Sequence, residues 1–313
     1  MRSFTVDTSA LAAGSGLTAV VTGGAGFIGS RLCDLLRLSG WEVHSASRRA
    51  QGPAAATRHW RVDFTDARST RELIEQTRPD HVFHLASVVS GAPGRELVLP
   101  TFQANLLTTV NLLTVLAETD CRRFVVTGSL VEPDPGSTDR IPSAPYAASK
   151  WASSDYVRMF HALYGLPGTI ARVFMAYGPA QQDPTKLVPY AIESLLRGEP
   201  PAISSGRRLI DWVYVDDVVY GLARMALADD VAGQTIDLGS GSVVSTVEFV
   251  ERICALAGTG LRPQVGAVAD RPLEPVRVAD VAATERVLGW APATALDDGL
   301  TRTIEWHRAQ RSA

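Results

Sequence analysis

The sequence predicts an α/β protein with a doubly wound parallel sheet and a smaller C-terminal lobe. Up to Val173, short apolar runs alternate with longer segments of helical period, which is the pattern of repeated β-α-β units. A glycine-rich turn joins the first apolar run to the first helical segment, which is typical of a sheet of the Rossmann type. After Val173, proline and glycine gather and the regular spacing loosens, which indicates the second lobe.

Each element is expected where its period and its flanking residues agree. Strands of the sheet are expected at short apolar runs that end in turn residues or charge: Leu17–Thr22, Trp41–Ser45, His81–Leu85, Arg123–Thr127 and Thr169–Val173. Helices long enough to cross over the sheet are expected at Phe27–Leu38, Ser69–Thr77, Phe102–Glu118 and Tyr146–Tyr164. The second of these helices is expected to begin with a capping box of Ser69 and Glu72.

Beyond the first lobe, helical periodicity returns at Val215–Leu227, Thr246–Ala257 and Leu296–His307, with a short strand at Gln234–Leu238. We therefore expect a dinucleotide-binding domain at 17–177, to which part of 211–240 returns, and a smaller substrate-binding lobe made of 178–210 and 241–313. Residues 1–16 form an N-terminal extension without the apolar stretch of a secretory signal.

Composition excludes several classes of protein. The 30 basic and 33 acidic side chains give a formal net charge of −3 without a block of like charge, so neither nucleic acid nor a membrane surface is an expected partner. No apolar run reaches the ~18–20 residues of a membrane helix. Three scattered cysteines lack Cys-x-x-Cys spacing, so we expect a reducing, cytoplasmic setting. No metal is expected, because His81 and His84 fall on opposite faces of their strand.

The turn after the first expected strand carries glycines at three-residue spacing. Gly23, Gly26 and Gly29 follow the apolar run that ends at Thr22, and they open the helix that starts at Phe27. Such glycines permit a tight turn, let backbone amides approach a pyrophosphate at the positive end of the helix, and allow close packing of helix and strand. Because a strand and a helix flank the turn, we expect a dinucleotide site rather than a purely structural turn.

The end of the second expected strand favours NADP over NAD. A carboxylate usually stands there to hold the ribose 2′-hydroxyl of NAD, but this chain has Ser47, Arg48 and Arg49. A hydroxyl and two guanidiniums suit a 2′-phosphate, because arginine forks match phosphate oxygens. The alternative is a loop with two solvated arginines. Asp63, which closes the next short run, could accept from an adenine amino group or cap its own loop.

Tyr146 and Lys150 lie four residues apart and so share one face of their expected helix. A nearby cation favours the ionised form of a phenol, so this spacing predicts a tyrosine that exchanges protons closer to neutrality. Such a pair also arises by chance on protein surfaces. Lys150 and Lys186 are, however, the only lysines among 30 basic residues, which favours a required ammonium at this position.

From the glycine turn onward, the chain resembles the extended short-chain dehydrogenase/reductase family, and within it the nucleotide-sugar epimerases, dehydratases and ketoreductases. The resemblance rests on an ordered series of motifs: GGAGFIG at Gly23–Gly29, Asp63, HLAS at His84–Ser87, Asn105, TGS at Thr127–Ser129, YAASK at Tyr146–Lys150, RVFMAYGP at Arg172–Pro179, DWVYVDD at Asp211–Asp217 and LGWAP at Leu288–Pro292. Because these matches cover nearly the whole chain after residue 17, together they are more specific than any one motif.

The resemblance implies a catalytic triad of Ser129, Tyr146 and Lys150. In it, Ser129 and Tyr146 bind the reacting oxygen, Tyr146 exchanges its proton, and Lys150 holds the nicotinamide ribose. The family pattern places Asp63, Ala86 and Asn105 in the cofactor site. Beside them we expect cofactor contacts from Gly23, Gly26, Phe27, Ile28, Gly29, Ser47, Arg48, Arg49, Phe64, Leu85, Ser87 and Thr127. On the substrate side it implies contacts from Val88, Ser129, Leu130, Met175, Leu187, Arg208 and Arg271.

Departures from the family pattern bear on the reaction. Dehydratases carry Asp-Glu directly after the catalytic hydroxyl residue, whereas this chain has Leu130 and Val131. Dehydration is therefore disfavoured unless Glu132 or Asp134 is displaced into that role. On the substrate side, Met175 and Ile210 replace an asparagine and an arginine. Candidate diphosphate anchors remain at Arg207, Arg208, Arg271 and Arg277, and Arg271 with Glu274 resembles a later element of the family.

These features favour an NADPH-dependent reductase of a keto group on a nucleotide-activated sugar, with a 4-keto-6-deoxy sugar nucleotide preferred and Tyr146 as the proton donor. Two alternatives use the same residues: an NAD-dependent nucleotide-sugar 4-epimerase, and a reductase of a carbonyl compound without a nucleotide. A non-catalytic dinucleotide sensor is disfavoured by the intact triad. The resemblance also implies a homodimer formed by the helices expected at Phe102–Glu118 and Tyr146–Tyr164.

Overall fold

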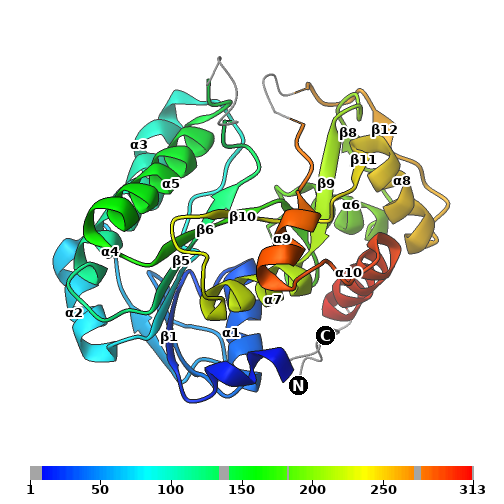
Figure 1. Cartoon of the computed structure of the whole chain (residues 1–313). Helices are drawn as coiled ribbons and strands as arrows, with labels where there is room; N and C mark the ends of the chain where they lie inside the picture. The colour runs from blue at the N-terminus through cyan, green and yellow to red at the C-terminus, as the bar shows by residue number, and fades with distance from the viewer. Residues whose placement is uncertain (1–8, 134–140, 182, 271–275, 312–313) are drawn as a thin grey trace.

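The centre of the molecule is a sheet of seven parallel strands in the order β10-β6-β5-β4-β1-β2-β3 (Figure 1). A computed structural model describes residues 9–133, 141–181, 183–270 and 276–311. The strands are β1 (Thr18–Thr22), β2 (Glu42–Ser47), β3 (Arg58–Arg61), β4 (His81–His84), β5 (Arg123–Ser129), β6 (Gly168–Val173) and β10 (Thr235–Leu238). The expected doubly wound sheet is confirmed, and its order reverses between β1 and β4, where open α/β sheets bind ligands.

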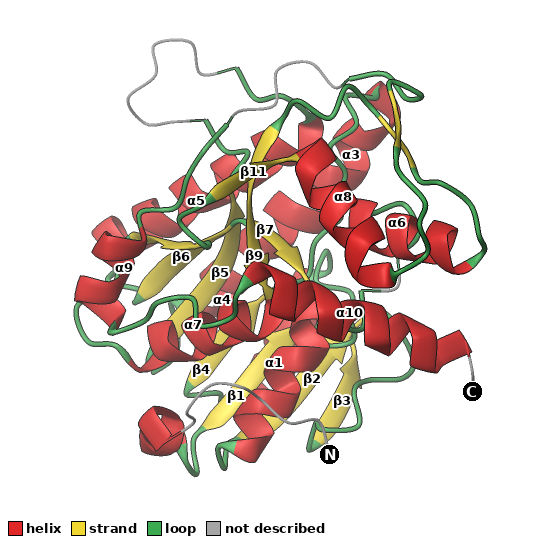
Figure 2. Cartoon of the chain, turned by 90° about the vertical axis from the view of Figure 1, so that its right-hand side faces the viewer, coloured by secondary structure: helices red, strands yellow, loops and turns green. Residues whose placement is uncertain are grey.

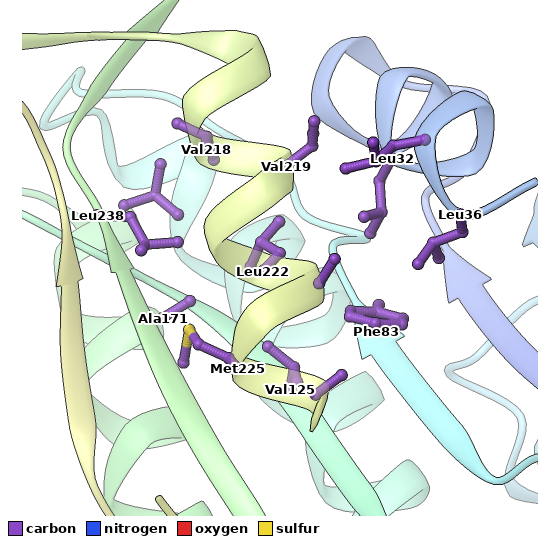
Figure 3. Close-up of a cluster of buried hydrophobic side chains, with 14 of the residues drawn as sticks. Leu32, Leu36, Phe83, Val125, Ala171, Val218, Val219, Leu222, Met225 and Leu238 are labelled. Carbon is purple, nitrogen blue, oxygen red and sulfur yellow. The ribbon is translucent and has the colours of Figure 1, made fainter. Parts of the chain in front are cut away.

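Helices cover both faces of this sheet because strand side chains alternate between the two faces. Val125 of β5 lies under α1 (Phe27–Leu38) and α7 (Val215–Leu227), in one buried cluster with Leu32 and Leu36 of α1 and Val218, Val219 and Leu222 of α7 (Figure 3). Its neighbour Val126 faces the other way, into a second buried cluster. That cluster is covered by α2 (Ala67–Thr77), α4 (Thr108–Leu116) and α5 (Pro145–Tyr164).

A smaller lobe stands beside the carboxyl ends of the strands. Its helices α6 (Leu187–Leu196), α8 (Thr246–Ala257) and α10 (Leu296–Arg311) pack together, as Figure 2 shows. Its short strands are β7 (Met175–Tyr177), β8 (Ala202–Ile203), β9 (Leu209–Tyr214), β11 (Val243–Ser245) and β12 (Gln264–Val265). Trp212 stacks on Phe249 in the core of this lobe, with ring centroids 3.8 Å apart.

A buried carboxylate ties the smaller lobe to the central sheet. Asp211 of β9 accepts hydrogen bonds from the backbone N–H groups of Ser240, Gly241 and Ala279. The first two residues follow β10, and the third precedes α9 (Val281–Leu288). Asp211 is almost completely buried, and these donors satisfy its charge where water cannot.

Two expectations about helix starts were wrong. Asp66, not Ser69, is the N-cap of α2, and its carboxylate accepts from the N–H groups of Arg68 and Ser69. Asp66 stands one residue before the helix, which is the position from which a side chain can reach these free amides. The helix expected at Phe102–Glu118 instead begins with α3 (Val98–Thr101), passes through a π-helical stretch η3 (Phe102–Leu107) and continues as α4.

Several elements had no counterpart among the sequence expectations. They are the short helices η1 (Ser9–Gly14) and η2 (Arg95–Leu97), the strands β3, β7, β8, β9, β11 and β12, and the helices α6 and α9. Most are too short to show a period. In the parts of the chain that are described, no helix has both the length and the apolar character that a membrane crossing requires.

Candidate functional site

A cleft of about 2170 Å³ runs along the carboxyl ends of the strands and continues to the smaller lobe. The sheet side contributes the turn after β1, the loops after β2 and β4, and the end of β5. Of the residues predicted to form a site, the cleft is lined by Gly23, Gly26, Phe27, Ile28, Gly29, Arg49, Leu85, Ser87, Thr127, Ser129, Leu130, Tyr146, Lys150, Met175, Leu187 and Arg208. The structure therefore brings most of the predicted residues to one place.

The glycine turn is held by contacts that leave no room for side chains. A Cβ atom on Gly29 would lie 2.3 Å from the carbonyl oxygen of Gly23, and one on Gly23 would lie 2.8 Å from the backbone nitrogen of Ala86. Gly26 closes the turn by donating its N–H to the carbonyl of Gly23 (2.8 Å) and is the N-cap of α1. The turn thus presents the N-terminus of α1 to the cleft, an arrangement that suits a phosphate group.

The loop after β2 folds back onto the glycine turn. The Arg49 guanidinium donates to the carbonyl oxygen of Ala25 (3.1 Å), and the Arg49 N–H donates to the Ser47 hydroxyl (3.2 Å). Arg48 and Arg49 are both exposed and Ser47 is half-buried, and of the three Arg49 lines the cleft. The positive charge at this end of the cleft therefore comes from Arg49.

Asp63 and Phe64 lie near this end but do not line the cleft. One carboxylate oxygen of the exposed Asp63 accepts from both the N–H (3.0 Å) and the hydroxyl (2.8 Å) of Thr65. This is the geometry of a side chain that caps its own loop. Phe64 is buried in the second core cluster.

Thr22 and His84 hold the start of the loop after β4. The Thr22 hydroxyl accepts from the N–H groups of Leu85 (3.2 Å) and Ala86 (3.1 Å) and bonds to Nδ1 of His84 (2.7 Å). Because the hydroxyl already accepts twice, its proton points to Nδ1, and Nε2 of His84 donates to Thr108 (3.3 Å). Burial and the charge of Lys150 lower the pKa of His84 to about 3, so the ring is neutral.

Asn105 holds the rest of this loop from behind. Its side-chain oxygen accepts from the N–H of Val88 (2.8 Å) and the hydroxyl of Ser87 (3.0 Å), and its amide donates to Ser149 of α5 (2.8 Å). Asn105 is buried within the π-helical stretch and does not line the cleft. It acts on the cleft through the loop that it positions.

Ser129, Tyr146 and Lys150 meet where β5 ends and α5 begins. A hydrogen bond joins the Tyr146 phenol to Ser129, and the Lys150 ammonium donates to the backbone carbonyl (2.8 Å) and the hydroxyl (3.3 Å) of Thr127. Burial lowers the pKa of Lys150 to about 8, although the charge of Glu132 opposes this shift. All three residues line the cleft.

The expected shift of the Tyr146 pKa towards neutrality was wrong in this structure. Burial raises the pKa of Tyr146 to about 12, and the hydrogen bond with Ser129 only partly opposes this effect. Removal of a phenolate from water costs more than this hydrogen bond returns, and the negative charge of Glu132 raises the pKa further. Tyr146 therefore holds its proton at neutral pH, as a proton donor must.

Glu132 is not placed to exchange protons with a bound substrate, which corrects the possibility considered above. Its side chain is buried, and its two oxygens accept from the N–H of Ser129 (2.6 Å) and the hydroxyl of Ser154 (2.9 Å). Leu130 and Val131 line the cleft instead. Asp134, the other residue considered for this role, lies outside the described residues.

The far side of the cleft belongs to the smaller lobe. Met175 and Ile210 line it as apolar surface, and Arg207 and Arg208 add positive charge. Arg277 and Val88 do not line it, and Arg271 and Glu274 lie outside the described residues. Within the described ranges, no group of three or more histidine, cysteine, aspartate or glutamate side chains could hold a metal ion.

Lys186 is a cleft residue that the sequence reasoning did not assign. Its ammonium donates to the carbonyl oxygen of Val89 (3.0 Å), so it reaches across from the start of α6 to the loop after β4. The signal that could have found it was its rarity, since it is one of two lysines in the chain.

Comparison with known proteins gives one family and many relatives. Residues 19–239 match the NAD dependent epimerase/dehydratase family. The chain is 31% identical to dTDP-glucose 4,6-dehydratase of Salmonella typhimurium over 340 residues, covering 93% of this chain and 92% of that protein. A solved structure of UDP-glucose 4-epimerase from Thermotoga maritima with UDP-glucose is 26% identical, with a TM-score of 0.84 over 94% of this chain and 100% of that one. UDP-glucose 4-epimerase of Thermus thermophilus in complex with NAD is 28% identical, with a TM-score of 0.80 over 93% and 99%.

Substitution of Gly29 by alanine tests the glycine turn. Because the added Cβ would meet the carbonyl of Gly23, the turn must open, and we expect at least about tenfold weaker binding of NADH and NADPH, or about 1.4 kcal/mol. Isothermal titration calorimetry measures this, and circular dichroism checks that the fold persists. Ser39→Ala, at the other end of α1, is the control, since its hydroxyl donates to the carbonyl of Leu35 and the residue does not line the cleft. Unchanged binding by Gly29→Ala would contradict a dinucleotide site here.

Proposed function

The chain belongs to the NAD-dependent epimerase/dehydratase family, and from this premise we propose that it reduces a keto group on a nucleotide-activated sugar with NADPH. A 4-keto-6-deoxy sugar nucleotide is the preferred substrate class. The observation that carries the proposal is the group of buried Ser129, half-buried Tyr146 and buried Lys150 on the wall of the cleft, in which the phenol holds its proton. Each part of the proposal rests on a separate feature of the cleft.

The glycine turn fits a dinucleotide. The close approach of Gly29 to Gly23 exposes the amides at the N-terminus of α1, which would hold the pyrophosphate. Lys150 and Thr127 would bind the nicotinamide ribose at the other end. When bound, the reduced cofactor supplies a hydride to the carbonyl carbon.

Proton transfer falls to the chain's own residues. Tyr146 donates its phenolic proton to the carbonyl oxygen as charge develops there, and Ser129 donates a hydrogen bond to the same oxygen. The ammonium of Lys150 stabilises the phenolate that Tyr146 becomes, since an opposite charge nearby favours the ionised form. Burial strengthens this interaction, because little water screens it.

Loss of water from the sugar is disfavoured, although the chain is similar to dehydratases. Leu130 and Val131 face the cleft directly after Ser129, and neither side chain can transfer a proton. Glu132 is turned away and uses both oxygens within the protein. This local change supports reduction over dehydration within the same scaffold.

The loop after β2 supports NADPH as the reductant. Ser47 stands where a carboxylate would hold a ribose hydroxyl, and the guanidinium of Arg49 lies on the glycine turn, on the wall of the cleft. An arginine at this place matches the charge and geometry of a 2′-phosphate. A reductase consumes its cofactor in each turnover, so a cofactor that exchanges freely suits this proposal.

A 4-epimerase with NAD is the second candidate, because solved UDP-glucose 4-epimerases resemble this chain over almost its whole length. The same Ser129, Tyr146 and Lys150 would serve it. Met175 and Ile210 on the far wall keep a carbonyl substrate without a nucleotide as a further candidate, while Arg207 and Arg208 there favour a diphosphate.

We also propose that two chains associate through α3, the adjoining η3 and α5. These elements pack together and expose large apolar side chains at Leu99, Phe102, Tyr156, Met159, Leu163 and Tyr164. A patch of this kind marks a protein interface. Two copies of one patch bury each other around a two-fold axis.

Tyr146→Phe tests the proton donor. We expect kcat for reduction of a keto sugar nucleotide to fall by about 10²–10⁴-fold. Cofactor binding should be retained, because the ring stays and only the hydroxyl is lost. Steady-state rates and calorimetry measure the two effects. Tyr220→Phe on α7 is the matched control, and a Tyr146→Phe enzyme with the parent's kcat would refute the role of the phenol.

Cofactor choice is tested with protein stripped of bound nucleotide. We expect NADPH to bind at least about tenfold tighter than NADH, and Arg49→Ala to remove this difference, since a charged hydrogen bond contributes about 1.5–3 kcal/mol. Nicotinamide fluorescence measures both affinities. Arg262→Ala, an exposed arginine of the smaller lobe, is the control. Equal or tighter binding of NADH would move the epimerase to first place.

Light scattering tests the dimer. We expect a mass twice the 33.5 kDa of the chain. Leu163→Arg should yield monomers, because it puts a charge into the apolar patch, whereas Val265→Arg on β12 should leave the mass unchanged. A parent protein that is monomeric at micromolar concentration would remove the proposed interface.

A further inference from the structure

Glu132 follows Ser129 by three residues, and the chain turns so that Glu132 contacts the backbone of Ser129. The chain turns after β5, and the turn is closed by the N–H of Glu132, which donates to the carbonyl of Ser129 (3.1 Å). In return, Oε1 of Glu132 accepts from the N–H of Ser129 at 2.6 Å. Both backbone groups of Ser129 are therefore held by one residue.

The same carboxylate reaches the neighbouring helix. Its Oε2 accepts from the hydroxyl of Ser154, at 2.9 Å. Ser154 lies on α5, four residues after Lys150 and thus on the same face of the helix. Glu132, Ser154 and Lys150 are each less than 5% exposed, so this tie between β5 and α5 is closed to water.

Gly128 makes space for this carboxylate. A Cβ atom at Gly128 would lie 2.6 Å from Oε1 of Glu132 and 2.9 Å from the Ile170 side chain. The backbone of Gly128 has no positive φ, so the turn does not require glycine for conformational reasons. The local sequence thus leaves room for a buried charge beside the reacting group.

The charged and titratable groups around this point are few. Lys150 donates to uncharged oxygens of Thr127, and Glu132 supplies the negative charge near it. From β4, His84 faces Lys150 as a neutral ring. Tyr146, from the first turn of α5, is protonated, and the charge of Glu132 contributes to its raised pKa. A buried ammonium needs a counter-charge, and in the described part of the site Glu132 is the carboxylate that acts on both reacting groups.

We propose that Glu132 is a positioning residue, which ties the backbone of Ser129 to the helix that carries Tyr146 and Lys150 and serves as the buried counter-charge of Lys150. The inference rests on the proposed function, in which these three residues form the proton-transfer group. Removal of the negative charge favours loss of the Lys150 proton and, separately, loss of the Tyr146 proton. Both titrations therefore move to lower pH when Glu132 becomes uncharged.

Glu132→Gln is the informative variant, because glutamine keeps one acceptor for Ser129 and loses only the charge. The two lysines of the chain allow a direct measurement with biosynthetically incorporated [6-¹³C]lysine, whose two NMR signals are assigned with Lys186→Arg. In the parent, we expect a midpoint at the lowered Lys150 pKa of about 8. In Glu132→Gln we expect this midpoint to fall by about one pH unit or more, while that of Lys186 stays fixed. An unchanged Lys150 midpoint would contradict the proposal that Glu132 is the counter-charge of Lys150.

Ser154→Ala separates position from charge. It removes the tie to α5 but keeps the carboxylate, so we expect the Lys150 midpoint to be retained while kcat falls about fivefold, the equivalent of about 1 kcal/mol. Ser153→Ala is its matched control. The buried Ser153 hydroxyl donates to the backbone carbonyl oxygens of Ser149 and Asn105 and does not contact Glu132. Equal kcat in both serine variants would overturn the positioning role.

The experiment does not depend on the substrate. The titrations use neither cofactor nor sugar, so a failure of the proposed reduction leaves the Lys150 result intact, and an active reductase with an unshifted Lys150 overturns only the role of Glu132. Should Glu132→Gln not fold, Gly128→Ala crowds the same carboxylate without changing any ionisable group. It should also lower the Lys150 midpoint, and a midpoint equal to that of the parent would count against the proposal.

Discussion

The site depends on one geometric constraint: all seven strands of the central sheet run parallel, so all their carboxyl ends lie along the same edge. Residues far apart in sequence, from the turn after β1 to the end of β5, are brought together there without a dedicated scaffold. The constraint also sets how closely the loops must pack. Gly23 rests against the backbone of Ala86, and no side chain other than hydrogen would fit between β1 and β4 at this level.

Polar groups at this edge are held mostly by neutral partners. Thr22 and Asn105 satisfy the amides of the loop after β4, and burial keeps His84 uncharged. A hydrogen-bonded network without charge can be buried at modest cost, whereas each buried ion needs compensation. The buried charges at this edge are those of Lys150 and Glu132, and the negative charge of Glu132 favours the ammonium form of Lys150.

The chain is similar to dehydratases in sequence, but the turn after Ser129 does not carry the acid and base of a dehydratase. The sequence is similar to dehydratases over most of its length, yet the residues after Ser129 offer apolar side chains to the cleft and turn the nearest carboxylate inward. The scaffold and the hydride-transfer geometry can be shared across a family, while the acid and base that decide the reaction sit on a few positions of one loop. For this reason the proposed reaction rests on the residues of this loop and not on the overall sequence identity.

The sequence by itself determined the strands of the main sheet other than β3, the glycine turn and the placement of Tyr146 and Lys150 on one helix, because each depends on local period or fixed spacing. It also named Ser47, Arg48 and Arg49 as candidate cofactor contacts, and of these the structure places Arg49 on the wall of the cleft. Tertiary structure decided what depends on distant contacts. The short strands β7 and β9 pair with each other, and because this pairing stabilises them, no period in the local sequence predicts them. The raised pKa of Tyr146 follows from burial and from the charge of Glu132, which together outweigh the hydrogen bond with Ser129. The inward turn of Glu132 follows from the space at Gly128 and the hydroxyl of Ser154, which only the folded chain places beside it.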